Sequence, residues 1–379
     1  MRNWILGTAA AALVISAAPA VAEDLTVITA GDQNMVDYVK NYLAPIFEET
    51  HPGVHVRAVG TGPGDAGSQK IIERLEAQKK AGKETWDSDV IVVHQKAAGG
   101  LVEGDLVARY RDDIDTGKLV TRANADKALG ADVKGYVMPM FNSQTALAYN
   151  PDLVKTPPQS YAELAAWAKT QPKQFGYNGI KGGMSGVSFV VGWVYAFGQD
   201  AAVLENGPFE KSELDKQADA FKKLKDFNQY VSFTPGNAGT LDMLSRGEIA
   251  MGPVWVDMFY SWQANGQLPP NLKLLLPKPG MPGQPMYYAI PAKAPHAELA
   301  RAFIELATSP KIQAEGIVKK FNWYPGIDAD NVKPELDDAT WQKLFTDITP
   351  EELASRGKAF PIKAYFDGIL ETYERTVNN

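Results

Sequence analysis

The chain of 379 residues contains no cysteine, so it can hold neither a disulfide framework nor a cysteine that accepts a lipid. After the N-terminal segment, no window is long and apolar enough to cross a bilayer. Lysine and arginine are scattered rather than gathered in a tract, and the net charge is -7. Because nucleic-acid binding requires a basic patch, this composition argues against nucleic acid as a partner.

Sequence motifs of common hydrolases and metalloenzymes are also missing. There is no G-x-S-x-G elbow and no H-E-x-x-H pair, and the four histidines lack the spacing of metal ligands. We therefore predict no metal site, no cofactor and no enzymatic activity. One alternative stays open, since the two carboxylates of a glycoside-processing enzyme meet only in space and leave no sequence motif.

The first 22 residues have the organisation of a signal peptide. Arg2 supplies one positive charge, an apolar run extends from Trp4 to Pro19, and Ala20-Val21-Ala22 matches an A-x-A cleavage site. The apolar run is shorter than the roughly 20 residues that span a bilayer. We predict that 1–22 is cleaved, that the mature chain begins at Glu23, and that the protein is exported to a Gram-negative periplasm.

Strands and helices alternate along the mature chain, which predicts an α/β fold with a mostly parallel sheet. Apolar runs predict strands at 25–29, 54–59, 89–93, 145–149, 249–253 and 286–291. Helical spacing predicts helices at 35–49, 68–80, 161–170, 187–197, 214–227 with Ser212 as a possible N-cap, 241–247 and 296–308. Residues 269–285 are rich in proline and glycine and predict a connector.

The mature chain is long enough for two domains of ordinary size. The extended segment around 136–149 interrupts the β/α alternation, and we interpret it as a crossing between two lobes. The predicted organisation is lobe 1 at 23–138 plus 291–320, lobe 2 at 142–286 plus 324–379, and hinge crossings near 139–141, 287–290 and 321–323.

Several phrases together resemble the extracellular solute-binding proteins of ABC importers, in their maltose-binding-like group. They lie at 44–54 (APIFEETHPGV), 146–154 (ALAYNPDLV), 157–164 (PPQSYAEL), 244–251 (LSRGEIAM) and 289–295 (AIPAKAP). Residues 167–177 (WAKTQPKQFGY) resemble the YnjB-type subgroup. The resemblance implies a type II periplasmic binding protein-like fold with two discontinuous lobes, a hinge and a ligand cleft. It also implies a transport role with ABC permease subunits as partners.

Open α/β sheets bind ligands at the carboxyl ends of their strands, and this position selects the candidate ligand-binding residues. They are Asp32 and Gln33 after the first strand; Gly64, Asp65 and Ser68 after the second; His94 and Gln95 after the third; Asn142 and Gln144 at the first crossing; Ser185 before a helix; Trp255 and Asp257 after the 249–253 strand; Tyr287 at a later crossing; and Trp323 in a turn.

Each candidate also has a plain structural interpretation. Asp32, Asp65 and Ser68 could cap helices, and His94 could be a buried structural imidazole. Trp255 could pack beside aromatic residues at helical spacing. The glycine-rich turn also matches G-x-G-x-x-G, but Pro63 within it and its place at the second β-α turn argue against nucleotide binding.

Aromatic, carboxylate and amide side chains together suit a hydroxyl-rich ligand, so a sugar or polyol is the favoured prediction. A small anion, such as a carboxylate, sulfonate or phosphate ester, is the first alternative, because the amides of the 60–70 loop would face it at a helix N-terminus. The second alternative is the secreted glycoside-processing enzyme.

Overall fold

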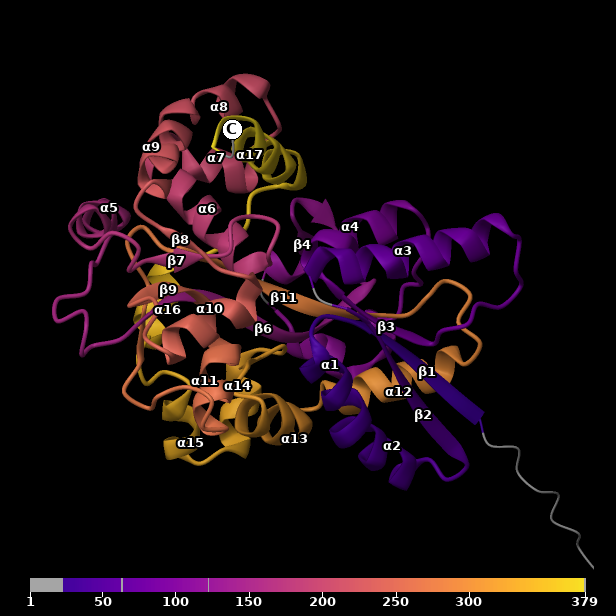
Figure 1. The fold of residues 1–379 in the computed structure, drawn as a ribbon. Coiled ribbons are helices and arrows are strands. Elements are labelled where there is room, and N and C mark those ends of the chain that lie inside the picture. Colours follow the sequence, from indigo (N-terminus) through magenta and orange to yellow (C-terminus); the bar gives the residue numbers. More distant parts are fainter. Residues whose placement is uncertain (1–22, 63, 122, 378–379) are drawn as a thin grey trace, which may run out of the picture.

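A computed structural model describes residues 23–62, 64–121 and 123–377 (Figure 1). The predicted signal peptide at 1–22 lies outside the described residues. Over the ranges that the structure describes, no helix combines the length and apolar character needed to span a membrane.

The fold is organised around one mixed sheet with the strand order β10-β6-β11-β3-β1-β2 (Figure 1). β1 (Glu23–Ala30) lies between β2 (Val54–Gly62) and β3 (Val90–His94) and is parallel to both. The predicted alternation of strands and helices is therefore present in this part of the chain. Every residue of β3 is buried, as expected for a strand covered on both faces of a sheet.

Helices cover both faces of these parallel strands (Figure 1). On one face, α1 (Gln33–Tyr38) and α2 (Ala44–Thr50) return the chain from β1 to β2, with α12 (Ala297–Ala307) beside them. On the other face lie α3 (Gly64–Lys80) and α4 (Gln95–Glu103). Because each helix begins shortly after a strand ends, the starts of α1, α3 and α4 gather at one edge of the sheet.

Two long strands connect this half of the molecule to the other. β6 (Val137–Tyr149) and β11 (Met281–Ala289) are antiparallel partners, and the last four residues of β11 also pair with β3. Beyond this region, β6 pairs with β9 (Met251–Trp255) and β10 (Lys273–Leu275). One strand thus belongs first to one half and then to the other.

The predicted crossings at 139–141 and near 287–290 fall on β6 and at the end of β11. Two short strands extend the shared region, since β12 (Tyr324–Pro325) pairs with β6 and β13 (Gly357–Lys358) pairs with β11. The exact lobe boundaries and the hinge stay predictions.

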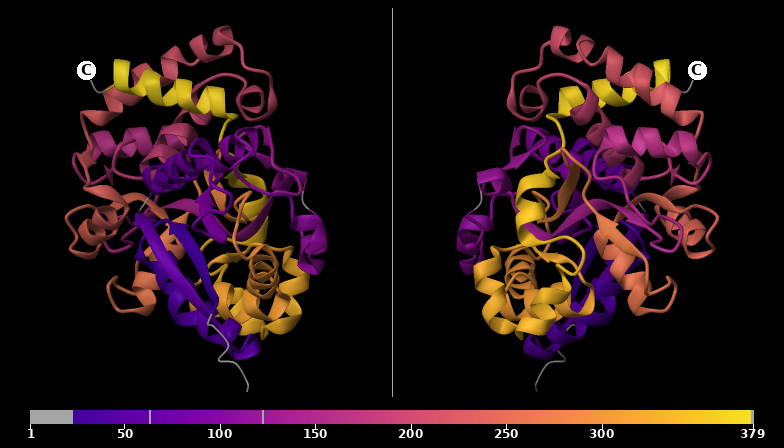
Figure 2. Two further views of the ribbon diagram at one scale, coloured as in Figure 1. Left: turned by 90° about the vertical axis from the view of Figure 1, so that its right-hand side faces the viewer. Right: turned by 90° about the vertical axis from the view of Figure 1, so that its left-hand side faces the viewer.

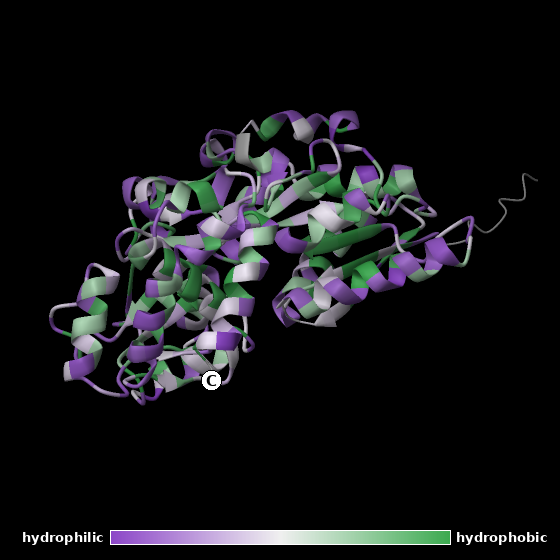
Figure 3. Cartoon of the chain, turned by 90° about the horizontal axis from the view of Figure 1, so that it is seen from above, coloured by the Kyte–Doolittle hydropathy of each residue, from purple (hydrophilic) through white to green (hydrophobic). Residues whose placement is uncertain are grey.

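The second half is built around α6 (Met184–Phe197), which is buried from Met184 to Tyr195 and packs against β11 and β9. Its sequence is apolar on all sides, as expected for a helix enclosed by its neighbours. α10 (Gly236–Ser245) and α11 (Val256–Ala264) flank β9. In Figure 3, strands coloured as hydrophobic lie inside, and helices with hydrophilic stretches lie outside them.

The remaining elements surround these layers. They are α5 (Tyr161–Thr170), α7 (Ala201–Asn206), α8 (Lys211–Asp215), α9 (Ala218–Asn228), α13 (Pro310–Ile312), α14 (Ala329–Val332), α15 (Asp338–Lys343), α16 (Pro350–Arg356), α17 (Lys363–Thr376), and the small strands β4 (Lys127–Ala128), β5 (Ala131–Asp132), β7 (Gly176–Tyr177) and β8 (Ser232–Phe233). Figure 2 shows α17 at the top of the second half, and it packs against α8 and α9.

Two predicted elements differ from the structure. The helix predicted at 214–227 is two helices, α8 and α9, and Ser212 lies inside α8 rather than capping it. Between the two helices, the buried side chain of Gln217 is held by hydrogen bonds with the backbone of Gln199.

The predicted connector at 269–285 contains β10 and the first half of β11. β11 tolerates Pro282 and Pro285 because β3 pairs with it only from Met286 onward. Its prolines therefore lie where the backbone N–H is not required on both sides, a position that proline can occupy in a sheet.

Candidate functional site

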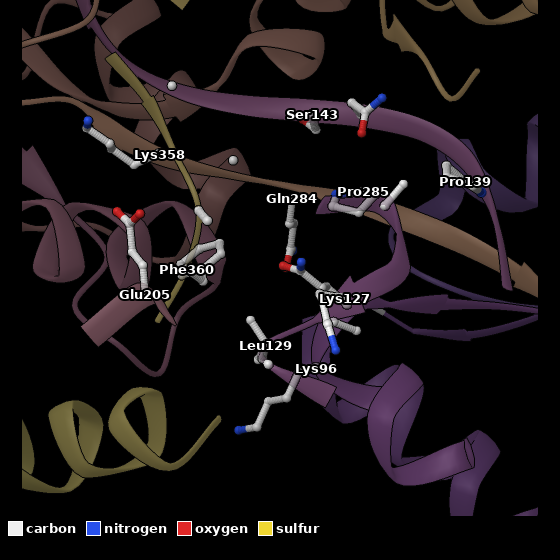
Figure 4. A pocket seen from close by; sticks show the side chains of 18 of the residues that line it. Lys96, Lys127, Leu129, Pro139, Ser143, Glu205, Gln284, Pro285, Lys358 and Phe360 are labelled. Carbon is white, nitrogen blue, oxygen red and sulfur yellow. The ribbon is translucent and has the colours of Figure 1, made fainter. Parts of the chain in front are cut away.

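A cavity of about 1180 Å³ lies between the two halves, beside the middle of β6 and β11 (Figure 4). Ser143 of β6 and Gln284 of β11 are paired in the sheet and both line the cavity. Figure 4 shows Gln284 pointing into it, with Lys96, Lys127 and Leu129 on one side and Glu205, Lys358 and Phe360 on the other. The cavity is thus enclosed by residues from both halves.

Three predicted ligand-binding residues, Gln95, Asn142 and Gln144, line this cavity. The amide groups of two of them are already bound to backbone. Gln144 donates to the carbonyls of Thr145 and Met281, and Asn142 donates to the carbonyl of Pro325 at 2.5 Å. Gln95 has a buried side-chain oxygen with no partner in the described part of the chain, so it is the freest of the three.

Ser143, Gln284 and Lys96 also line the cavity but were not predicted from the sequence. Ser143 stands between two predicted residues, and the period-2 alternation of a strand places its side chain on the face opposite to theirs, so the sequence pattern argues against it. Gln284 was missed because its neighbourhood was predicted to be a connector. Lys96 is adjacent to Gln95 in the first turn of α4, but charged residues at helix starts are too common to single it out.

The glycine-rich turn between β2 and α3 is shorter than the predicted one, because strand and helix both extend into it. β2 continues to Gly62 and α3 begins at Gly64, whose φ is +64°. At Gly67, a Cβ atom would lie 1.9 Å from the carbonyl oxygen of Gly62, so no larger residue fits there without a backbone shift. Gly62 also has a positive φ, of +101°, so the backbone geometry accounts for all three glycines of the G-x-G-x-x-G pattern without a phosphate.

Ser68 and His94 form a buried pair at the edge of the sheet. The Ser68 hydroxyl lies 3.0 Å from His94 Nδ1 and accepts a hydrogen bond from the His94 backbone N–H at 3.1 Å. Burial lowers the pKa of His94, although the charge of Asp65 partly opposes this. The pair ties the end of β3 to α3, which supports the structural interpretation of both residues.

Lys96 links the two halves at the mouth of the cavity. Its ammonium lies 3.7 Å from a carboxylate oxygen of Asp65 on α3 and 3.2 Å from one of Asp367 on α17. The same ammonium lies 5.1 Å from the centre of the Phe366 ring, within the range of a cation-π interaction. Lys363 also pairs with Asp367, at 2.7 Å, but within α17.

Asp257 has the most strongly perturbed carboxyl pKa around this region. It is the second residue of α11, only 6% of its surface is exposed, and the Ser143 hydroxyl donates to it. Burial raises its pKa to about 6, the hydrogen bond from Ser143 opposes the rise, and the charge of Asp32 adds to it. Asp257 therefore lies behind Ser143, and the predicted residues Asp32, Asp257 and Trp323 are not among the residues that line the cavity.

Asp32 precedes α1 at its N-cap position, but its side chain makes no capping hydrogen bond. Its carboxylate has no ion-pair or hydrogen-bond partner among the residues described, and partial burial raises its pKa. Gln33, in contrast, donates to Asp37 on the exposed face of the same helix. The capping interpretation of Asp32 therefore has no support in the structure.

Trp323 was predicted as a turn residue on the cavity wall, but it is 1% exposed. Its ring stacks on Phe141, with centroids 4.3 Å apart, and on Phe321 at 5.0 Å. The neighbouring Tyr324 lines the cavity and its hydroxyl has no hydrogen-bond partner in the described chain. This aromatic stack therefore packs beneath the crossing, next to Tyr324 in the chain.

The other candidates are buried against protein groups. Trp255, 7% exposed, is the last residue of β9 and pairs with Thr145, and Tyr287 is fully buried in β11. The Ser185 hydroxyl donates to the side chain of Asn237 at 2.8 Å. Within the described ranges, no group of three or more His, Asp or Glu side chains is placed to hold a metal ion. The cavity presents amides, a hydroxyl and charged groups, which can bind a small polar molecule.

Comparison with known proteins gives three findings. A family model described as bacterial extracellular solute-binding protein matches residues 43–345. The fold is similar to a putative extracellular solute-binding protein from Bordetella parapertussis, with a TM-score of 0.70 and 16% identity, covering 94% of this chain and 99% of that one. No curated protein sequence matches the chain.

Two further solved structures share the fold. A spermidine/putrescine ABC transporter substrate-binding protein from Streptococcus pneumoniae gives a TM-score of 0.70 at 13% identity, covering 94% of this chain and 98% of that one. A maltose-bound protein from T. maritima gives 0.74 at 16% identity, covering 93% of each. The predicted type II periplasmic binding protein-like fold is confirmed by these similarities, whereas the YnjB-type subgroup stays a prediction.

Proposed function

Because the chain belongs to the family of bacterial extracellular solute-binding proteins, we propose that it captures a small polar solute between its halves and delivers it to the permease of an ABC importer. The observation that carries this proposal is the cavity of about 1180 Å³, whose lining comes from both halves of the molecule. A ligand bound there contacts both halves at once, which is what a transport protein needs in order to signal that it is loaded.

The two strands β6 and β11 would act as the hinge, because they are the long elements shared by both halves. Bending at a few residues of such strands would open the cavity to solvent while leaving each half intact. The free energy of ligand binding would then stabilise the closed conformation relative to the open one. The permease would recognise that shape through surfaces of both halves.

A sugar or polyol stays a candidate ligand, as the sequence predicts. The hydroxyl of Ser143 and the amides of Gln95 and Gln284 face the cavity and could exchange hydrogen bonds with ligand hydroxyl groups. The anionic alternative has support from Lys127, which lines the cavity and points into it in Figure 4. The spread of ligands in the names of structural neighbours, which include polyamine and maltose, favours neither.

We also propose that the protein works in the periplasm and that 1–22 directs its export, as the A-x-A site at Ala20-Val21-Ala22 indicates. Determining the N-terminal residue of the protein recovered from a periplasmic extract tests this directly. A mature chain that begins at Glu23 is the expected result, and an intact Met1 in the recovered protein would contradict it.

Thermal unfolding in the presence of a ligand panel tests the transport assignment. A ligand at a hundredfold excess over its dissociation constant should stabilise the folded chain by about 2.7 kcal/mol. At least one small polar solute should raise the melting temperature and leave the reaction mixture chemically unchanged. Release of product from chromogenic glycosides would instead favour the glycoside-processing alternative.

A further inference from the structure

The two halves of the molecule are joined by a backbone hydrogen bond at one end of the interlobe cavity. The N–H of Lys363, the first residue of α17, donates to the carbonyl oxygen of Leu129 in the other half at 2.8 Å. The preceding N–H, that of Ile362, donates to the carbonyl of Leu204 within its own half at 2.9 Å. N–H groups in the first turn of a helix have no acceptor within that helix. The start of α17 therefore uses one such group to bind a carbonyl of the opposite half.

The turn that supplies this carbonyl has a backbone conformation that leucine rarely adopts. Ala128 pairs with Ala131 in the hairpin of β4 and β5, so Leu129 and Gly130 are the two central residues of the turn. Both have a positive φ, of +48° at Leu129 and +88° at Gly130. Turns of this kind favour Asn, Asp or Gly at these positions, and backbone strain tends to persist where a conformation has a function. The strained residue here is the one whose carbonyl contacts α17.

Close packing accompanies the hydrogen bond. A Cβ atom on Gly130 would lie 2.8 Å from Cγ2 and 3.0 Å from Cβ of Ile362, which belongs to the other half. These separations are shorter than ordinary van der Waals contact, so a larger residue at this position would push Ile362 away. Glycine is therefore required here by the contact between the halves as well as by its φ.

Lys96 adds an electrostatic contact beside the turn. Its ammonium lies 3.2 Å from a carboxylate oxygen of Asp367 in α17. Both side chains are partly exposed to solvent, and an ion pair in that setting contributes little by itself. The ion pair, the hydrogen bond and the packing lie at the same end of the cavity, because Lys96, Leu129, Gly130, Ile362 and Lys363 all line it. Figure 4 shows Lys96 and Leu129 beside each other at this end.

We propose that these contacts form a clasp, in which Lys96 and the Leu129-Gly130 turn of one half hold residues 362–367 of the other, and that the clasp releases when the halves separate. Each polar group of the clasp can bind water once the halves part, so opening leaves none of them buried without a partner. The use of this motion in solute exchange rests on the proposed function. The clasp itself is a property of the chain without any ligand.

Distances between two spin labels, measured by pulsed electron paramagnetic resonance, test the clasp without a ligand. The chain has no cysteine, so Glu76→Cys on α3 and Lys222→Cys on α9, both exposed, place one label on each half. Lys363→Pro removes the N–H that donates to Leu129 and puts the proline ring in its place. This variant should fold, because proline is favoured at the first position of a helix and the ψ of 152° at Ile362 suits a residue before proline.

Lys363→Pro should increase the fraction of molecules with a longer distance between the labels. Lys363→Ala is the matched control, since it removes the same side chain but keeps the N–H, and it should give the distances of the labelled parent protein. Equal distance distributions for the two folded variants would overturn the clasp.

A second pair of variants tests the packing contact. Gly130→Ala should also lengthen the distance between the labels, and adding Ile362→Ala should move it back toward the parent value, because the colliding Cγ2 atom is removed. Gly135→Ala is the control for backbone strain, since Gly135 has a φ of +82° in the same half but its Cβ would meet only the flexible guanidinium of Arg109. An equal effect of Gly135→Ala, or no recovery with Ile362→Ala, would overturn the contact. The transport function would still stand, because the thermal-shift panel tests it separately.

Discussion

At the scale of single residues, Asp257 places a carboxylate where a neutral side chain would be more stable. It is buried next to Ser143, whose hydroxyl donates to it, and burial raises its pKa to about 6 from the usual 3.8. A raised carboxyl pKa means that folding favours the protonated form. This contribution to stability is present below about pH 4 and is lost as the pH rises through about 6.

Replacing Asp257 by Asn should therefore stabilise the ligand-free protein at pH 7 by about 2–3 kcal/mol. The gain should shrink as the pH falls below 6 and vanish near pH 4. Urea unfolding at a series of pH values measures it, with Asp215→Asn on the exposed face of α8 as a control that changes little. A variant less stable than the wild type at pH 7 would show that Asp257 is a structural residue.

Whereas replacing Asp257 should stabilise the protein, replacing Ser68 should destabilise it, because the Ser68 hydroxyl is hydrogen-bonded to both the ring and the backbone N–H of His94. Ser68→Ala should lower the free energy of unfolding by about 1–3 kcal/mol, since it leaves the backbone N–H of His94 buried without a partner. Ligand affinity should change little. A large loss of affinity with normal stability would instead return Ser68 to the ligand site, where the sequence analysis placed it.

The sequence predicted only part of the site. Gln95, at the start of the helix after β3, and Asn142 and Gln144, within β6, line the cavity, whereas the candidates after β1 and β9 are not in its lining. Whether a side chain such as Trp323 faces a ligand or packs under the crossing depends on its rotamer and on distant partners such as Phe141. Sequence position alone cannot supply that information.

At the scale of secondary-structure elements, the turn between β2 and α3 should lose more stability when Gly67 is replaced than when Gly64 is replaced. A Cβ at Gly67 would collide with the backbone of Gly62, whereas at Gly64 it would meet no atom within 4 Å. Gly67→Ala should therefore cost more stability than Gly64→Ala, whose cost of about 1 kcal/mol arises from its positive φ. Thermal unfolding of the two variants compares them. Equal costs would mean that the backbone of the turn moves freely.

The contact between α4 and α17 holds the two halves together through Lys96. Lys96→Met keeps much of the side-chain volume but loses both ion pairs, so the ligand-free protein should open and its radius of gyration in small-angle X-ray scattering should rise. Lys363→Met is the matched control, because its pair with Asp367 stays within α17. If both variants scatter like the wild type, Lys96 does not restrain opening.

Element prediction succeeded where the hydrophobic period was clear and failed where local composition misled. The strands at 54–59 and 89–93 and the helix at 161–170 agree with the structure because their periodicity reflects burial. β11 was partly missed because proline and glycine usually mark loops, and nothing local reveals that β6 shields this strand. The break between α8 and α9 follows from a tertiary contact of Gln217 with Gln199.

At the scale of the whole molecule, two halves that share β6 and β11 enclose a cavity, and the account depends on a solute binding there. A smaller hollow of about 570 Å³ also lies between α8, α9 and α17, entirely within the second half. A ligand in that hollow would contact one half only and could not couple binding to closure.

A crystal structure with the solute that gives the largest thermal shift shows whether the interlobe cavity is the binding site. We expect electron density for the solute in this cavity, within hydrogen-bond distance of Ser143 or Gln284 and touching residues of both halves. Density for the solute in the hollow beside α17, or anywhere on a single half with the interlobe cavity empty, would contradict it.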